Sequence, residues 1–69
     1  MIVSDFTVPE LDSFRAMCNF VGNEKPVFEM RSRGIPLEEI AEQLNMSIEG
    51  TKRISRKVNR KILTIINYN

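Results

Sequence analysis

The sequence predicts an all-α fold, a small bundle of about four helices, and three observations support it. Apolar residues recur at helical spacing in four separate stretches of the chain. Gly or Asn stands at each break between these stretches, as is typical of helix ends and turns. Hydrophobic residues make up 42% of the 69 residues and charged residues 28%, a balance typical of a small globular domain.

The N-terminal part is expected to form an extended arm over residues 1–8, followed by a single domain over residues 9–69. Pro9 suits the first turn of a helix, where its missing N–H group costs little. A first helix over residues 9–20 places five apolar side chains at helical spacing: Leu11, Phe14, Met17, Cys18 and Val21.

A second helix is predicted over residues 24–33, with Asn23 as its N-cap and Gly34 at its left-handed C-terminal end. Its apolar residues are Val27, Phe28 and Met30. A third helix is predicted over residues 37–44, followed by a tight turn at Asn45, because Asn tolerates a positive φ. Its inner side chains are Leu37, Ile40, Ala41 and Leu44, and those expected to face water are Glu38, Glu39 and Glu42.

The fourth predicted helix covers residues 47–66, and Ser47 suits its N-cap. At about 100° per residue, one stripe of this helix is mostly apolar and is expected to pack on the domain: Thr51, Ile54, Val58, Ile62 and Ile65. The other side is basic and is expected to face outward: Lys52, Arg53, Arg56, Lys57, Arg60 and Lys61.

The net charge of +1 hides a strong asymmetry along the chain. Residues 1–44 hold four basic and eight acidic side chains, a net charge of −4. Residues 45–69 hold six basic side chains and one acidic side chain, a net charge of +5. Such a distribution is typical of a protein whose basic end binds a polyanion.

Several classes of function are not indicated. The chain has no His and a single Cys, Cys18, so we expect neither a disulfide nor a zinc site, and we expect Cys18 to be a buried small hydrophobe. No nucleophile–base pair accompanies the acidic residues, so we expect no enzyme, no catalytic residue and no cofactor. No apolar run approaches the roughly 20 residues that span a bilayer. The first five residues also lack the pattern of a signal peptide, so a cytoplasmic location without membrane or small-molecule partners is expected.

Residues 36–54 read PLEEIAEQLNMSIEGTKRI, which is a short amphipathic helix, a three-residue turn and a Ser-capped basic helix. The major groove of B-DNA admits one α-helix, and a second helix that crosses behind it sets its angle. Ala41 is small enough for a close approach of the two helices, and Met46 is placed to fill the corner between them. This order of elements indicates a DNA-binding pair of helices.

The run EEIAEQLNMS followed by GTKR resembles the helix-turn-helix of bacterial sigma factors of the housekeeping family, in the domain that reads the upstream promoter element. It also resembles the LuxR-type output domain, and NEKPVFEMRSRG resembles the helix before the motif in both. The resemblance covers residues 23–62. It implies a standalone regulator encoded by a bacterium, a phage or a mobile element, with double-stranded DNA and RNA polymerase as candidate partners.

By position, the resemblance implies that Ser47 caps the helix and contacts a phosphate. The residues that fall where these families meet base edges or nearby phosphates are Glu49, Gly50, Lys52 and Arg53. Those that fall further along, where phosphate contacts are expected, are Arg56, Lys57 and Arg60. The chain departs from the families at Pro36, where a capping Ser or Thr is usual, and at Gly50 and Thr51, where Thr and a branched apolar residue are usual.

Near the C-terminal end, Leu63 points nearly opposite to the docking stripe and has no evident internal partner. Leu63 and Ile66 are therefore candidates for a homodimer contact, which is usual for regulators that read paired half-sites. Packing of this end against the first helix is the other interpretation.

We therefore expect a sequence-specific transcriptional regulator that binds double-stranded DNA. The alternative is a protein-interaction module that binds RNA polymerase or another regulator through the acidic N-terminal half or the apolar C-terminal tail. Binding to single-stranded nucleic acid is disfavoured, because such sites interleave aromatic and basic side chains. In this chain the aromatic residues all lie outside the basic face: Phe6, Phe14, Phe20, Phe28 and Tyr68.

Overall fold

The computed structural model describes the backbone of residues 2–68 and the side chains of residues 2–67. Within this part lie four α-helices, preceded by one 3₁₀ turn: η1 (Val3–Asp5), α1 (Val8–Met17), α2 (Glu24–Ser32), α3 (Leu37–Gln43) and α4 (Ile48–Tyr68). No strand occurs among the described residues. The predicted all-α bundle of four helices is confirmed, and its helix boundaries differ from the expected ones by at most three residues.

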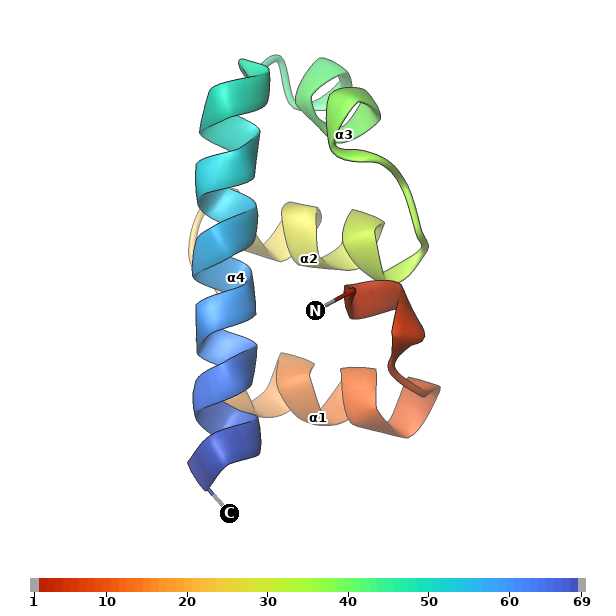
Figure 1. The fold of residues 1–69 in the computed structure, drawn as a ribbon, viewed down its shortest axis with the longest axis vertical. Coiled ribbons are helices and arrows are strands. Elements are labelled where there is room, and N and C mark those ends of the chain that lie inside the picture. Colours follow the sequence, from red (N-terminus) through yellow and green to blue (C-terminus); the bar gives the residue numbers. More distant parts are fainter. Residues whose placement is uncertain (1, 69) are drawn as a thin grey trace.

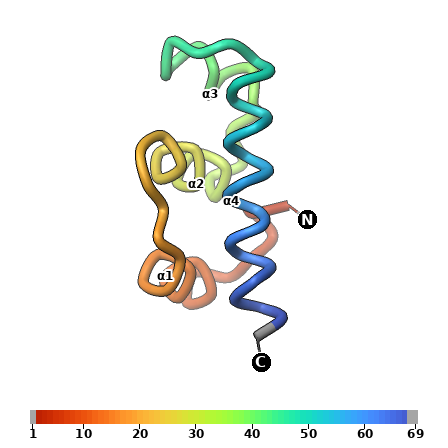
Figure 2. Tube along the Cα trace, turned by 90° about the vertical axis from the view of Figure 1, so that its left-hand side faces the viewer, coloured from red at the N-terminus to blue at the C-terminus, as the bar shows by residue number. Residues whose placement is uncertain are grey.

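Helix α4 forms one whole side of the molecule. The protein measures 35 × 18 × 18 Å, and α4 runs along the long dimension (Figure 1). The other three helices cross α4 steeply, α3 near its N-terminal end, α2 in the middle and α1 near its C-terminal end (Figure 1). In the view turned by 90°, α1, α2 and α3 all lie on the same side of α4 (Figure 2). Within the described part of the chain, the opposite side of α4 is therefore covered by no other α-helix (Figures 1 and 2).

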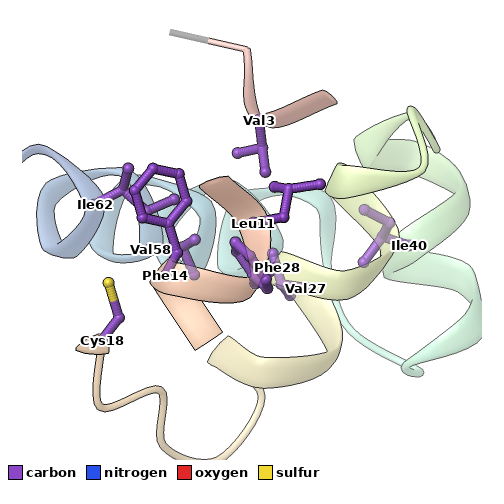
Figure 3. Packing of buried hydrophobic residues seen from close by; sticks show 9 residues of the cluster. All are labelled: Val3, Leu11, Phe14, Cys18, Val27, Phe28, Ile40, Val58 and Ile62. Atoms are coloured by element: carbon purple, nitrogen blue, oxygen red, sulfur yellow. The ribbon is translucent and has the colours of Figure 1, made fainter. Parts of the chain in front are cut away.

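The hydrophobic core lies between α4 and the three shorter helices. Its members come from all the elements (Figure 3): Val3, Leu11, Phe14, Cys18, Val27, Phe28, Ile40, Val58 and Ile62. The rings of Phe6 and Phe14 meet edge to face at 4.9 Å, and those of Phe20 and Phe28 stack at 4.7 Å. Burial of each large apolar side chain stabilises the fold by about 1.5–3 kcal/mol, so the core fixes how α4 is rotated against the domain.

A capping box starts α1, as its sequence allows. Thr7 is the N-cap, and its hydroxyl accepts a hydrogen bond from the backbone N–H of Glu10 at 3.4 Å. The carboxylate of Glu10 in turn accepts one from the backbone N–H of Thr7 at 2.8 Å. Pro9 lies in the first turn, where the missing N–H leaves no hydrogen bond unmade, which confirms its predicted position.

The expected breaks between helices are also confirmed. Gly22, Gly34 and Asn45 have φ values of 57°, 80° and 54°, in the left-handed region that favours Gly and tolerates Asn. Asn23 precedes α2 as expected, but its side chain does not cap the helix. Its amide Nδ2 instead donates to the sulfur of Met46 at 3.3 Å, which joins the start of α2 to the α3–α4 corner.

The N-terminal segment differs from the extended arm expected over residues 1–8. Residues Val3–Asp5 form a 3₁₀ turn, and Val8 already belongs to α1; residue 1 lies outside the described part. Val3 is only 2% exposed, and Phe6 packs against the core. The physical reason is that a small domain has few apolar side chains for its core. Burying Val3 and Phe6 lowers the free energy of the folded state, whereas an extended arm would leave both side chains in water.

Two residues of the first predicted apolar stripe are wrongly placed by the periodicity. Met17 and Val21 are 60% and 54% exposed, although Leu11, Phe14 and Cys18 are buried as expected. Helix α1 ends at Met17, because the backbone of Cys18 is already extended. The helical spacing therefore no longer applies at Val21.

Candidate nucleic-acid interface

A set of short hydrogen bonds fixes the corner between α3 and α4. The backbone N–H of Met46 donates to the carbonyl oxygen of Ala41 at 2.8 Å, which closes the turn. The Ser47 hydroxyl accepts from the backbone N–H of Gly50 at 3.0 Å, so Ser47 caps α4 as predicted. The hydroxyl of Thr51 is fully buried and donates to the carbonyl oxygen of Ser47 at 2.9 Å. The start of α4 is therefore held rigidly against α3.

The predicted docking stripe of α4 is confirmed. Its side chains are buried or half-buried: Thr51, Ile54, Val58, Ile62 and Ile65. Val58 and Ile62 are 1% and 0% exposed and meet core residues of α1 and α2 (Figure 3). Because the stripe is fixed inward, the side chains on the other half of α4 are directed to solvent.

Five basic side chains lie on that solvent-facing side, and we call them the basic face: Lys52, Arg53, Arg56, Lys57 and Arg60. Of these five, only Lys52 forms an ion pair with a residue in the described part of the chain, namely with Glu49 at 3.8 Å. Both partners are largely exposed, and a surface pair of this kind contributes at most about 1 kcal/mol. The charge of the basic face is therefore almost uncompensated by the domain itself.

Lys61 was expected on this face, and the structure corrects that expectation. Its ammonium group is half-buried and donates to the carboxylate of Glu24 and to the carbonyl oxygen of Asn19. Glu24 is only 8% exposed and also accepts from the backbone N–H of Val21 at 3.2 Å. The hydrogen bond from Lys61 holds the pKa of the Glu24 carboxyl below its usual value. Lys61, the sixth cation of α4, therefore contacts other residues of the domain and is not part of the basic face.

The packing around position 50 explains why a glycine fits there, which the sequence alone does not show. A Cβ atom at this position would lie 3.1 Å from the hydroxyl oxygen of Ser47 and 3.5 Å from the terminal methyl group of Met46. The glycine therefore makes room for the helix cap and for Met46. Next to it, the side chain of Glu49 is 77% exposed at the first turn of α4.

Ion pairs within the domain neutralise part of the negative charge of residues 1–44. Arg15 binds Glu29 and Asp12, each at 2.7 Å. The hydrogen bond from Arg15 keeps the pKa of Glu29 below its usual value. Three acidic side chains stay exposed on α3 with no ion pair among the described residues: Glu38, Glu39 and Glu42.

Leu63 and Ile66 follow the basic face toward the C-terminal end of α4. They are 43% and 42% exposed, so neither is packed fully into the domain.

No helix in the described part of the chain is long and apolar enough to cross a membrane. Residues 2–67 also bring no three His, Cys, Asp or Glu side chains together in a way that could hold a metal ion.

No protein-family model, no curated protein and no solved structure matches this chain. The relation to sigma factors and LuxR-type domains therefore stays a prediction from the quoted motifs.

Proposed function

We propose that this chain binds double-stranded DNA, with the basic face of α4 in the major groove. One observation carries the proposal: over residues 52–60, five cations extend into solvent from a helix whose opposite side is buried in the core. These residues span about 12 Å along the helix, and a duplex carries one negative charge per roughly 1.7 Å of its axis. Several phosphates therefore lie within reach of the basic face at once.

The shape of the molecule supports the same proposal. An α-helix with its side chains is about 10–12 Å wide, and the major groove of B-DNA is about 12 Å wide. Helices α1, α2 and α3 all lie on the far side of α4, so they do not obstruct its approach (Figures 1 and 2). Helix α3 supports the N-terminal turn of α4, through the corner at Met46 and Ser47, and would set the angle of entry.

Within this proposal, the cations divide by their place along α4. Arg53 lies near the rigid N-terminal end, where a guanidinium can bind both O6 and N7 of a guanine. Arg56 and Lys57 lie about one turn further along, where the groove walls place phosphates. Arg53 would therefore contribute to sequence preference, and the other two to affinity for any duplex. A protein with both properties would act as a transcriptional regulator.

A titration of labelled duplexes at several salt concentrations tests the proposal. Each phosphate contact contributes about −0.9 to the slope of a plot of the logarithm of the binding constant against the logarithm of the salt concentration. Five contacts would therefore give a slope of about −4.5. Binding that does not respond to salt, or no binding at low salt, would refute it. A duplex selected from a random library should bind more tightly than a shuffled one, if the protein is sequence-specific.

The same titration has a second informative outcome. A chain that binds no duplex but is retained by RNA polymerase would be the protein-interaction module considered above. The exposed carboxylates of α3 would then be the first surface to test: Glu38, Glu39 and Glu42.

A further inference from the structure

The N-terminal elements η1 and α1 lie at the edge of the core rather than in its centre. The large side chains that are fully buried in the described part of the chain all belong to α2, α3 and α4: Val27, Phe28, Ile40, Thr51, Val58 and Ile62. In η1 and α1, Val3 is 2% exposed, Phe14 5% and Leu11 8%. The three C-terminal helices therefore share a centre of their own, which η1 and α1 cover.

Few polar contacts hold η1 and α1 to the other helices. No backbone hydrogen bond of the described residues joins residues 2–18 to α2, α3 or α4. Among the described side chains of this segment, only Arg15 forms a hydrogen bond to another helix, and it donates to the carboxylate of Glu29 at 2.7 and 2.8 Å. The side chain of Arg15 is 37% exposed, so water and salt screen this ion pair. The attachment therefore depends mainly on apolar burial.

The border of α1 is only partly filled by side chains. Three hollows of about 370, 350 and 250 Å³ open along it, and Met17 lines all three. The first also borders Lys25 and Glu29 of α2, and the other two border Ile65 of α4. Where a hollow separates two helices, their side chains lose the close contacts that attract them to each other. Helix α1 therefore meets α2 and α4 across a partly open border.

The chain that follows α1 has contacts of its own with the C-terminal helices. The carbonyl oxygen of Asn19 accepts a hydrogen bond from the ammonium group of Lys61. The ring of Phe20 stacks on the ring of Phe28 at 4.7 Å. Between α1 and these contacts, the backbone of Cys18 is extended. Helix α1 can therefore separate from the domain up to Cys18 while Asn19 and Phe20 stay in place.

We propose that residues 2–18 form a strap that detaches as one unit while α2, α3 and α4 stay folded. Helix α1 has only ten residues, and a helix of this length is marginal in water by itself, so its amides lose their hydrogen bonds on release. Segment η1 leaves together with α1, because Phe6 packs edge to face on Phe14. Such an opening of one supersecondary unit below the free energy of global unfolding is a common property of small domains.

The open strap uncovers apolar surface and leaves the basic face supported. The inner stripe of α4 loses its cover at Ile62 and Ile65, which pack in the same cluster as Phe14. The hydrogen bond from Lys61 to Glu24 still joins α4 to α2, since neither residue belongs to the strap. The strap therefore controls access to an apolar part of α4. That duplexes bind with the strap open or closed is a consequence that rests on the proposed function, whereas the strap itself does not.

Hydrogen exchange of the native protein at increasing urea concentrations below the unfolding transition tests the strap without any variant. Relative to their intrinsic rates, the amides of Leu11 and Cys18 should exchange at least about ten times faster than those of Ile54 and Val58. Their opening should also respond less to urea, because it exposes less surface than global unfolding does. The thiol of Cys18 should report the same equilibrium, with a reaction slowed as much, relative to the unfolded chain, as these amides are.

Two variants separate the strap from the three helices beneath it. Leu11→Ala removes an apolar contact that both the open and the unfolded state lack, so it should speed the exchange of strap and α4 amides by the same factor. Ser47→Ala removes the cap of α4, which the open state keeps. It should therefore speed the exchange of Ile54 and Val58 and leave that of the strap unchanged. Full release of the strap in Leu11→Ala, with α2–α4 still protected, would support the proposal as well.

The proposal is overturned if the strap and α4 amides of the wild type share one opening equilibrium, because the whole chain then unfolds together. Faster exchange of the strap in Ser47→Ala, or loss of all protection in Leu11→Ala, would overturn it too. DNA is absent from these experiments, so their failure would not bear on duplex binding.

Discussion

The ammonium group of Lys61 donates a hydrogen bond to the carboxylate of Glu24, 37 residues earlier in the chain. A second hydrogen bond, to the carbonyl oxygen of Asn19, ties the same side chain to the connection between α1 and α2. Lys61 therefore holds α4 against the rest of the domain, whereas Lys57, one turn earlier, is exposed. Two cations of one helix thus have different surroundings, and variants of the buried and the exposed kind can be compared by experiment.

The salt dependence of duplex binding should distinguish a cation of the basic face from the scaffold cation. In the proposed complex Arg56 contacts one phosphate, so Arg56→Ala should make the slope of the log–log plot shallower by about 0.9. Lys61→Ala removes the same charge from the sequence but no phosphate contact, so its slope should equal that of the wild type. Fluorescence anisotropy of one labelled duplex at several salt concentrations measures both.

The same two variants should also differ in stability: Lys61→Ala, which leaves the salt slope unchanged, should be the less stable one. Lys61→Ala leaves the buried carboxylate of Glu24 without its main partner, which should lower the free energy of unfolding by about 1–3 kcal/mol. Arg56→Ala should have little effect, because Arg56 is exposed and makes no ion pair among the described residues. Circular dichroism must show that both variants are folded at the binding temperature. Equal changes of salt slope in the two variants would refute the separation of roles.

Stability should decrease in acid because of Glu24 and Glu29. Lys61 and Arg15 lower the pKa of these carboxyls in the folded protein. On acidification, the unfolded state takes up protons first, near the usual Glu value of about 4.3. The stabilisation is therefore complete above that pH and is lost as the pH falls through the lowered values.

Thermal unfolding between pH 7 and pH 2 measures this loss, with Glu24→Gln and Glu39→Gln as a matched pair. Glu24→Gln should be less stable than the wild type at neutral pH and should lose less stability in acid. Glu39→Gln changes an exposed side chain of α3 and should leave the acid limb of the curve in place. An acid limb that is the same in all three proteins would contradict the assignment.

Ser47 and Gly50 should be energetically coupled. Ser47→Ala removes the cap of α4 and should cost about 0.5–2 kcal/mol. Gly50→Ala gains up to about 1 kcal/mol of helix propensity, but its new methyl group would crowd the Ser47 hydroxyl at 3.1 Å. Gly50→Ala should therefore be more favourable when Ser47 is already Ala. A double-mutant cycle by urea unfolding measures the coupling, and additive effects would show that the crowding is without consequence.

The thiol of Cys18 should react slowly in the folded protein. It is 8% exposed, and burial raises its pKa, which the nearby charge of Lys61 only partly offsets. Less thiolate and little access both slow attack on a disulfide reagent. The rate with such a reagent should be far below that of the urea-unfolded chain at the same pH. A native rate close to the unfolded one would show that the thiol is accessible.

The sequence predicted the helices well, because their signals are local. The stripe from Thr51 to Ile65 and the cap at Ser47 depend only on neighbours within α4, and both are confirmed. The positive φ values of Gly34 and Asn45 follow from the same local chemistry. The five exposed cations of the basic face also follow from helical spacing, once the inner stripe is known.

The errors arise where distant segments meet. No helical periodicity indicates that Lys61 pairs with Glu24, because that contact joins two helices across the fold. The burial of Val3 likewise depends on cover from α1 and α2, which the N-terminal segment alone cannot show. The position of Lys61 itself carries a signal of the first error, because at about 100° per residue Lys61 lies beside the stripe residues Val58 and Ile65 rather than opposite them.

The most direct test of the central claim is an NMR titration of the ¹⁵N-labelled protein with a short duplex. We expect amide and guanidinium signals to shift along the basic face, at Arg53, Arg56 and Lys57 above all. Signals of Glu38 and Glu42, which are also exposed but lie on α3 and are acidic, should stay in place. Shifts centred on α1 or α2, or no shifts at low salt, would contradict duplex binding by this face of α4.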